Sequence, residues 1–122
     1  MSNGYEEINS YSVDEIRSAI SSNDLYLMRE ASLVASLLFK ELTIAESLCR
    51  ELFDHEDEQV RGNAVLGFGH LARRFGKLDK KTALPLIESA LVDSSDYVRG
   101  QAWAAAEDVG HFLGWKPEGF VE

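Results

Sequence analysis

The sequence predicts an all-α protein made of about three helical hairpins, and two observations support this fold class. Signals for helix starts are frequent along the chain, whereas the sustained apolar/polar alternation that marks strands is absent. The pattern V-R-G-x-A occurs at Val60 and again at Val98, 38 residues later. A repeat of this length, made of two helices, indicates hairpins that stack because none can bury its apolar face alone.

Capping residues divide the chain into six predicted helices. Candidate caps at helix starts are Ser12, Asp24, Thr43, Asp57, Asp79 and Ser95. Two of them, Ser12 and Thr43, are followed three residues later by Glu15 and Glu46, which is the pattern of a capping box. Gly76 and Gly114 lie where left-handed helix ends are expected. The predicted helices cover about residues 13–22, 25–41, 44–54, 58–75, 80–92 and 96–113.

The domain organisation follows from these elements. Residues 12–114 are predicted to form one helical repeat domain, between a disordered tail at 1–11 and a C-terminal tail at 115–122 that caps the last hairpin. No apolar run approaches the roughly 20 residues that a membrane span needs, and the N-terminal residues lack the features of a secretory signal. We therefore expect a cytoplasmic protein that does not bind membranes.

The similarity between the two halves extends beyond the V-R-G-x-A pattern. Leu48 aligns with Leu86, and Gly76 aligns with Gly114. Apolar residues fall on one stripe of each second helix at helical spacing: Val60, Ala64, Phe68, Leu71 and Phe75 in the first, and Val98, Ala102, Ala106, Val109 and Leu113 in the second.

In this pattern the chain resembles the HEAT-repeat (armadillo-like) family. The repeats of that family carry a loop Asp before the second helix, followed by a Val-Arg pair and then an Ala, and residues 57–64 and 95–102 match this order. The acidic residue is offset by one position between the two copies, and the first hairpin keeps only a degenerate form around Met28 and Arg29. The resemblance covers roughly residues 13–113 and implies a short right-handed solenoid.

The resemblance also implies a structural role for Arg61 and Arg99. The matching arginine of HEAT repeats commonly pairs with loop carboxylates of neighbouring repeats. Asp57 and Asp96 are suitable partners in this chain.

The charges are strongly unbalanced, with 21 Asp and Glu against 12 Lys and Arg and a net charge of −9. Nucleic-acid binders normally carry the opposite excess, so no nucleic-acid partner is expected. On the hairpin model, basic residues fall in the turns between hairpins and acidic residues in the turns within them. The predicted acidic ridge consists of Asp54, Glu56, Asp57, Glu58, Asp93 and Asp96, with Tyr97 beside it. The ridge either binds a basic partner or only complements the helix dipoles.

No set of residues with a catalytic pattern is found in the sequence, so neither an enzyme nor a cofactor is expected. His55-Glu56 resembles the pairs with which HEAT-like deoxyhypusine hydroxylases hold iron, but one pair cannot enclose a metal, and no metal site is expected. His70 has no suitable ligand set at helical spacing. Cys49 is expected to be a small buried residue rather than a nucleophile.

Two further features leave alternatives open. Gly67 and Gly69 lie inside a predicted helix, which indicates either tight packing against a neighbouring helix, or a bend or a site where a partner approaches the backbone. Trp103 lies off the apolar stripe, so it either belongs to an interface or is covered by the C-terminal tail through Trp115 and Phe120.

Small size, acidic charge and the lack of a catalytic pattern favour a protein-binding module. Small stand-alone bacterial HEAT-like proteins include toxin immunity proteins. The sharpest expectation is therefore an immunity protein that neutralises a toxin, such as a nuclease, by covering its basic active-site surface. The alternative is a general scaffold, adaptor or self-associating HEAT protein with no toxin partner.

Overall fold

The computed structural model describes residues 12–121, and this part of the chain is all-α. Its six helices are α2 (Val13–Ser22), α3 (Leu25–Leu38), α4 (Leu42–Phe53), α5 (Glu58–Phe75), α6 (Lys80–Leu91) and α7 (Asp96–Leu113). The predicted all-α class and the six predicted helices are thereby confirmed. The predicted disordered tail, residues 1–11, lies outside the described residues. None of the described helices is both long and apolar enough to cross a membrane.

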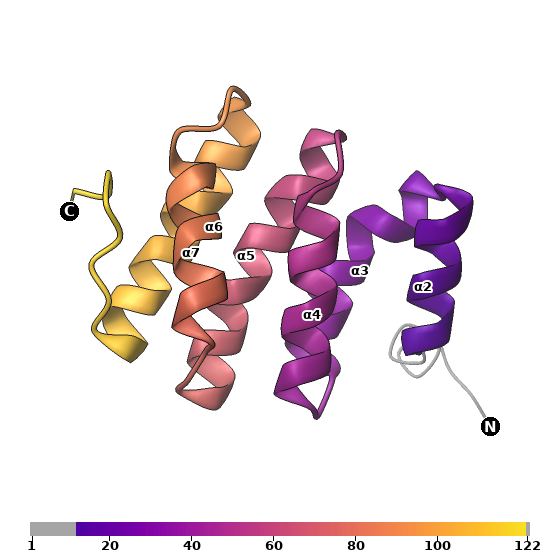
Figure 1. The fold of residues 1–122 in the computed structure, drawn as a ribbon, viewed down its shortest axis with the longest axis horizontal. Coiled ribbons are helices and arrows are strands. Elements are labelled where there is room, and N and C mark those ends of the chain that lie inside the picture. Colours follow the sequence, from indigo (N-terminus) through magenta and orange to yellow (C-terminus); the bar gives the residue numbers. More distant parts are fainter. Residues whose placement is uncertain (1–11, 122) are drawn as a thin grey trace.

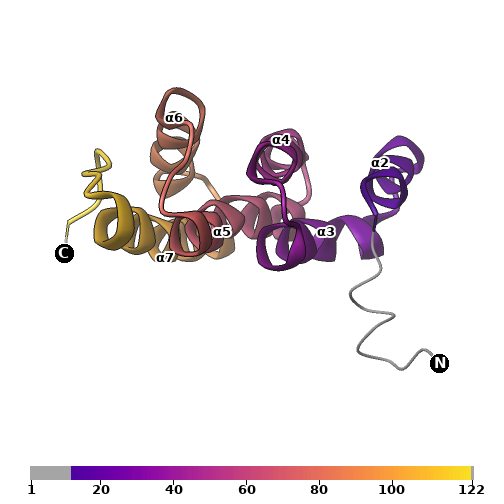
Figure 2. The same ribbon diagram turned by 90° about the horizontal axis from the view of Figure 1, so that it is seen from below.

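The six helices pack in two layers. Figure 2 shows α2, α4 and α6 in one layer and α3, α5 and α7 in the other. Figure 1 shows that pairs of consecutive helices follow one another along the long axis of the molecule, with the C-terminal residues beside α7. Within this arrangement α5 is central, because it contacts α3, α4, α6 and α7.

Most helix ends are formed by the residues that the sequence indicates. Ser12 Oγ accepts a hydrogen bond from Glu15 N at 3.1 Å, and Glu15 Oε1 accepts one from Ser12 N at 2.9 Å, so this capping box is confirmed. The side chains of Asp24, Asp57 and Ser95 also accept hydrogen bonds from backbone N–H groups of their helices. Gly76 and Gly114 end α5 and α7 with φ values of 67° and 72°, a region that glycine enters without strain.

The boundary between α3 and α4 differs from the prediction. Helix α3 ends at Leu38 because Phe39 is extended, with φ −68° and ψ 142°. Helix α4 begins at Leu42, so Thr43 is inside the helix and the predicted capping box of Thr43 and Glu46 is wrong. Glu46 instead accepts a hydrogen bond from the backbone N–H of Asp79 at 2.7 Å, which is a contact between elements that local spacing cannot show.

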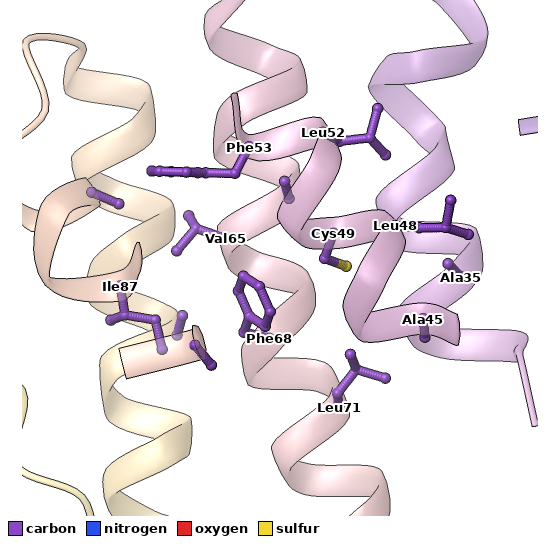
Figure 3. Close-up of a cluster of buried hydrophobic side chains, with 14 of the residues drawn as sticks. Ala35, Ala45, Leu48, Cys49, Leu52, Phe53, Val65, Phe68, Leu71 and Ile87 are labelled. Atoms are coloured by element: carbon purple, nitrogen blue, oxygen red, sulfur yellow. The ribbon is translucent and has the colours of Figure 1, made fainter. Parts of the chain in front are cut away.

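The predicted apolar stripes form the centre of the core. Val60, Ala64, Phe68 and Leu71 of α5 are buried, and Figure 3 shows α5 side chains meeting those of α3, α4 and α6. Cys49 is fully buried in this cluster, and burial raises the pKa of its thiol to about 12. The prediction that Cys49 is buried is confirmed, and a thiol with so high a pKa carries almost no thiolate.

The helix-interior glycines are sites of close helix packing. A Cβ atom on Gly67 would lie 2.7 Å from Cys49 Sγ of α4. A Cβ atom on Gly69 would lie 3.1 Å from Ala105 Cα of α7. Both distances are shorter than ordinary van der Waals contact, so the packing explanation for these glycines is confirmed.

The C-terminal residues 115–121 pack against the last two helices. Trp115 lies under Lys80, with the Lys80 Nζ atom 5.6 Å from the ring centroid. Glu118 N donates to Glu88 Oε2 of α6 at 2.7 Å, and the ring centroid of Phe120 is 4.5 Å from that of Trp103. Of the two interpretations of Trp103, the structure shows partial cover by the tail, which leaves 42% of this residue exposed.

A pair of equivalent glycines tests the packing around α5. A Cβ atom on Gly62 would lie 2.7 Å from the ring of Tyr97, whereas one on Gly100, the equivalent residue of the second V-R-G-x-A pattern, meets nothing within 4 Å. We expect Gly62→Ala to lower the free energy of unfolding by about 1 kcal/mol, because overpacking exceeds the gain in helix propensity. The matched Gly100→Ala change should raise it by about 0.5–1 kcal/mol. Urea denaturation measures both, and equal effects of the two changes would contradict this account.

Candidate protein-binding surface

Three helix–helix turns form one continuous surface, which we call the turn edge. It consists of residues 23–26, 54–59 and 92–97, from the turns before α3, α5 and α7. Side-chain bonds join these turns: His55 Nε2 donates to Asn23 Oδ1 at 2.9 Å, and Ser95 Oγ donates to the carboxylate of Glu58. The three turns are therefore held together in the fold although they are far apart in the sequence.

Two bidentate ion pairs hold the turn edge in place. Arg29 Nε and Nη2 donate to the two carboxylate oxygens of Asp57, at 3.1 and 2.9 Å. Arg61 Nε and Nη2 donate to the two carboxylate oxygens of Asp93 in the same way, at 3.0 and 2.9 Å. Each arginine thus binds the turn of the following hairpin, with the paired geometry that makes guanidinium–carboxylate bonds strong and directional.

The arginines also bind backbone carbonyls of the turns. Arg61 Nη1 donates to Glu56 O at 2.7 Å, and Arg99 Nη1 donates to Asp93 O at 2.6 Å. Arg99 also pairs with Asp96. Of the two carboxylates that the sequence suggested for the arginines, Asp96 does pair with Arg99, whereas Asp57 pairs with Arg29. The partner of Arg61 is Asp93.

The carboxylates of the predicted ridge divide into two groups. Asp57 and Asp93 are half-buried, and their arginine partners lower both pKa values, that of Asp57 to about 2. Asp54 and Glu56 are exposed, and neither forms an ion pair within residues 12–121. The turn edge therefore keeps negative charge that its own arginines do not neutralise.

Exposed apolar side chains lie among these carboxylates. Val92 is 78% exposed and Tyr26 is 72% exposed. The predicted ridge residue Tyr97 is 39% exposed, and its hydroxyl donates to Asn63 Oδ1 at 2.5 Å, which fixes the ring on α5. The sequence interpretation missed Val92 because it placed this residue at the end of a predicted helix at 80–92. Its alignment with the turn residue Asp54 is the signal that identifies it.

Basic residues at the opposite ends of the helices also have structural partners. Arg74 Nη1 and Nη2 donate to Ser36 O and Phe39 O, each at 2.6 Å. These bonds satisfy carbonyl groups at the end of α3, which no helical N–H can reach. Lys40, Lys77 and Lys81 are exposed at this side of the molecule.

The residues that the sequence analysis weighed as metal ligands or catalytic groups do not gather at one site. Residues 12–121 contain no group of three or more His, Cys, Asp or Glu side chains that could hold a metal ion. His55 Nδ1 accepts from Asp57 N at 2.9 Å, so Nε2 carries the proton donated to Asn23 and the imidazole joins two turns. Burial lowers the pKa of the half-buried His70, and the nearby Arg73 lowers it further.

The Asp57 ion pair gives a prediction for pH dependence. We expect Asp57→Asn to lower the free energy of unfolding at pH 7 by about 1–2 kcal/mol, because the variant loses a charged bond to Arg29. The pKa of Asp57 is about 2 in the folded chain, below the value of about 3.9 for an unfolded Asp. Its stabilisation is therefore complete above about pH 4 and is lost as the pH falls towards 2.

Denaturation at several pH values measures this difference between wild type and variant. The exposed Asp54→Asn is the matched control and should change stability by less than about 0.5 kcal/mol at every pH. If the difference in the free energy of unfolding between wild type and Asp57→Asn stays constant from pH 7 to pH 2, the ion pair is not the source of that difference.

Comparisons with protein-family models, curated proteins and solved structures find no match to this chain. The established features are the six packed helices and the turn edge with its two kinds of carboxylate. A fold made of packed helices does not specify a function by itself. The function must therefore be argued from the surface that the fold presents.

Proposed function

We propose that this chain is a protein-binding module of the HEAT type and that its turn edge binds a basic surface of another protein. In its sharpest form the proposal is an immunity protein that covers the basic active-site surface of a toxin, such as a nuclease. The partner is a protein; the proposal includes no nucleic acid, membrane, cofactor or catalytic step.

One observation carries the proposal: the turn edge is held rigidly and still presents unneutralised carboxylates around exposed apolar residues. Asp54 and Glu56 are exposed beside the ion pairs that fix the turns. Val92 and Tyr26 offer apolar area on the same edge. Binding sites typically combine such apolar anchors with a surrounding polar rim, and a preorganised surface loses little conformational freedom on binding.

The charge of the turn edge favours a basic partner. A negative surface accelerates encounter with a positive one, by about 10- to 1000-fold at low ionic strength. The overall charge of −9 acts in the same direction and disfavours a polyanionic partner. Such steering suits an antagonist that must capture its target quickly.

The HEAT assignment within this proposal rests on the relation between successive hairpins. Arg29 and Arg61 each bind the turn of the next hairpin through the same two-bond geometry, which is the pairing that the family resemblance implies. The layers of alternate helices in Figure 2 are compatible with stacked hairpins.

A self-associating scaffold is the second candidate. Leu37 and Leu38, at the end of α3, are 43% and 37% exposed. Apolar residues on a helix at one end of a stack are suited to contact a second copy. Light scattering separates the candidates, since a self-associating scaffold gains mass with concentration and a monomeric antagonist does not.

The acidic surface is tested with charge-matched variants. The reading frames adjacent to the gene for this chain are expressed singly, and any that stop growth are co-expressed with the chain. We expect the wild type to restore growth and to bind the product. The variant Asp54→Asn/Glu56→Gln/Asp96→Asn should bind at least about tenfold more slowly at low salt, because it removes the steering charge.

The control Asp14→Asn/Glu41→Gln/Glu107→Gln removes three exposed carboxylates elsewhere and changes the net charge equally. It should bind at nearly the wild-type rate. Equal slowing in both variants would assign the effect to net charge instead of the turn edge. If no adjacent product binds, the immunity form of the proposal fails.

The apolar part of the turn edge has its own prediction. We expect Val92→Ser to leave the free energy of unfolding within about 0.5 kcal/mol of wild type, because the side chain is 78% exposed. The same change should weaken partner binding by about tenfold or more if Val92 is a central contact. Calorimetric titration with the purified partner measures the affinity, and an unchanged affinity would remove Val92 from the interface.

A further inference from the structure

A second feature of the surface is a cleft between α4 and α6. It has a volume of about 210 Å³ and is lined by Thr43, Glu46, Ser47, Arg50, Phe68, Asp79, Thr82 and Ala83. Four of these residues come from one face of α4, and Phe68 of α5 lies between the two helices (Figure 3). The cleft is separate from the turn edge and shares no residue with it.

The ion pairs between helices of this layer differ on the two sides of α4. Between α2 and α4, Arg17 Nη1 and Glu51 Oε1 form an ion pair at 2.7 Å. Between α4 and α6 no ion pair is formed within the described residues, and Arg50, next to Glu51 in the sequence, faces the cleft instead. The cleft therefore contains a guanidinium without a carboxylate partner.

The two carboxylates of the cleft, those of Glu46 and Asp79, each accept a hydrogen bond from the described residues with only one oxygen. Glu46 Oε2 accepts from Asp79 N at 2.7 Å, and Asp79 Oδ2 accepts from Thr82 Oγ1 at 2.9 Å. The second oxygen of each carboxylate makes no hydrogen bond within residues 12–121. These two oxygens can accept bonds from a ligand cation, with hydroxyl groups of the cleft beside them.

The polar lining is not a requirement of the hairpin pattern. At a spacing of 38 residues, Glu46 corresponds to Leu84 and Ser47 corresponds to Pro85. The next hairpin thus has apolar residues where the cleft has an acid and a hydroxyl. Glu46 and Ser47 therefore distinguish this face of α4 from the matching face of α6, although the other two cleft positions are polar in both helices.

We propose that this cleft binds a small zwitterion of the α-amino acid class. The ligand ammonium group would lie between Glu46 and Asp79, and its carboxylate would pair with Arg50, one helical turn or about 5.4 Å further along α4. No ion pair links Glu46 and Arg50 directly, so a ligand can bridge them.

Size and chemistry exclude other ligand classes. A volume of about 210 Å³ corresponds to about seven water molecules at about 30 Å³ each, and it is below the roughly 300 Å³ at which sites for larger ligands begin. A phosphate or other simple anion would meet two carboxylates. A sugar would find no aromatic face for stacking, because Phe68 is 1% exposed. For a metal ion, the described residues offer no group of three His, Cys, Asp or Glu side chains.

The test is an NMR titration of the ¹⁵N-labelled protein with each common α-amino acid singly, at about 10 mM, where a ligand with a millimolar Kd is well populated. We expect at least one amino acid to shift the amide signals of Thr43, Ser47 and Thr82. Its N-acetyl derivative lacks the ammonium charge, and its amide lacks the carboxylate. Both derivatives should bind at least about tenfold more weakly, because each loses one charged contact.

Variants locate the site. Glu46→Gln keeps an oxygen that can accept from Asp79 N, and Arg50→Gln changes an exposed residue, so both should fold. Each should weaken binding by about tenfold or more. Glu51→Gln, which removes a carboxylate on the other side of the same helix, should bind as wild type.

Absence of localised shifts with every amino acid would overturn the proposal. Equal binding of the zwitterion and its two derivatives would also overturn it, as would equal weakening in the Glu51→Gln control. The proposal does not depend on the turn edge, and the titration uses the chain without a protein partner.

Discussion

The close approach of other helices to α5 is the constraint on which the rest of the structure depends. Gly67 admits Cys49 of α4, and Gly69 admits α7 near Ala105, at distances that leave no room for a Cβ atom. Glycine inside a helix weakens it by about 1 kcal/mol relative to alanine. This loss is offset only because α5 contacts both helix layers at once and buries its apolar stripe against them.

Because other helices pack against α5 on both sides, the turns that precede α3, α5 and α7 come close to one another. Arg29 and Arg61 then reach the carboxylates of the following turns, and the half-buried Asp57 and Asp93 exchange bonds with water for bidentate bonds with guanidinium groups. Exposed single ion pairs contribute little, but bidentate pairs with restricted solvent access are stronger and set a defined geometry. The main effect of the ion pairs is therefore to fix the geometry of the turn edge, and their effect on the stability of the core is smaller.

The sequence predicted the elements well because local rules govern them. Caps such as Ser12 and glycine ends such as Gly76 depend on residues within one turn of a helix. The errors arose where distant residues decide: Phe39 is extended where Arg74 binds its carbonyl, and Glu46 bonds to Asp79 instead of capping its own helix. The gathering of the ridge carboxylates could be predicted from the hairpin pattern, whereas the pairing of Arg61 with Asp93 and the exposure of Val92 required the arrangement in space.

Capping and dipole complementation account for only part of the acidic residues in the turns. Dipole complementation and capping need one carboxylate or hydroxyl at each helix start, and Asp57 and Ser95 meet that need for α5 and α7. Asp93 serves an ion pair. Asp54 and Glu56 serve none of these purposes, since they precede the cap of α5 and remain exposed. Their charge faces solvent, and it is the part of the turn edge on which the proposed binding to a basic partner rests.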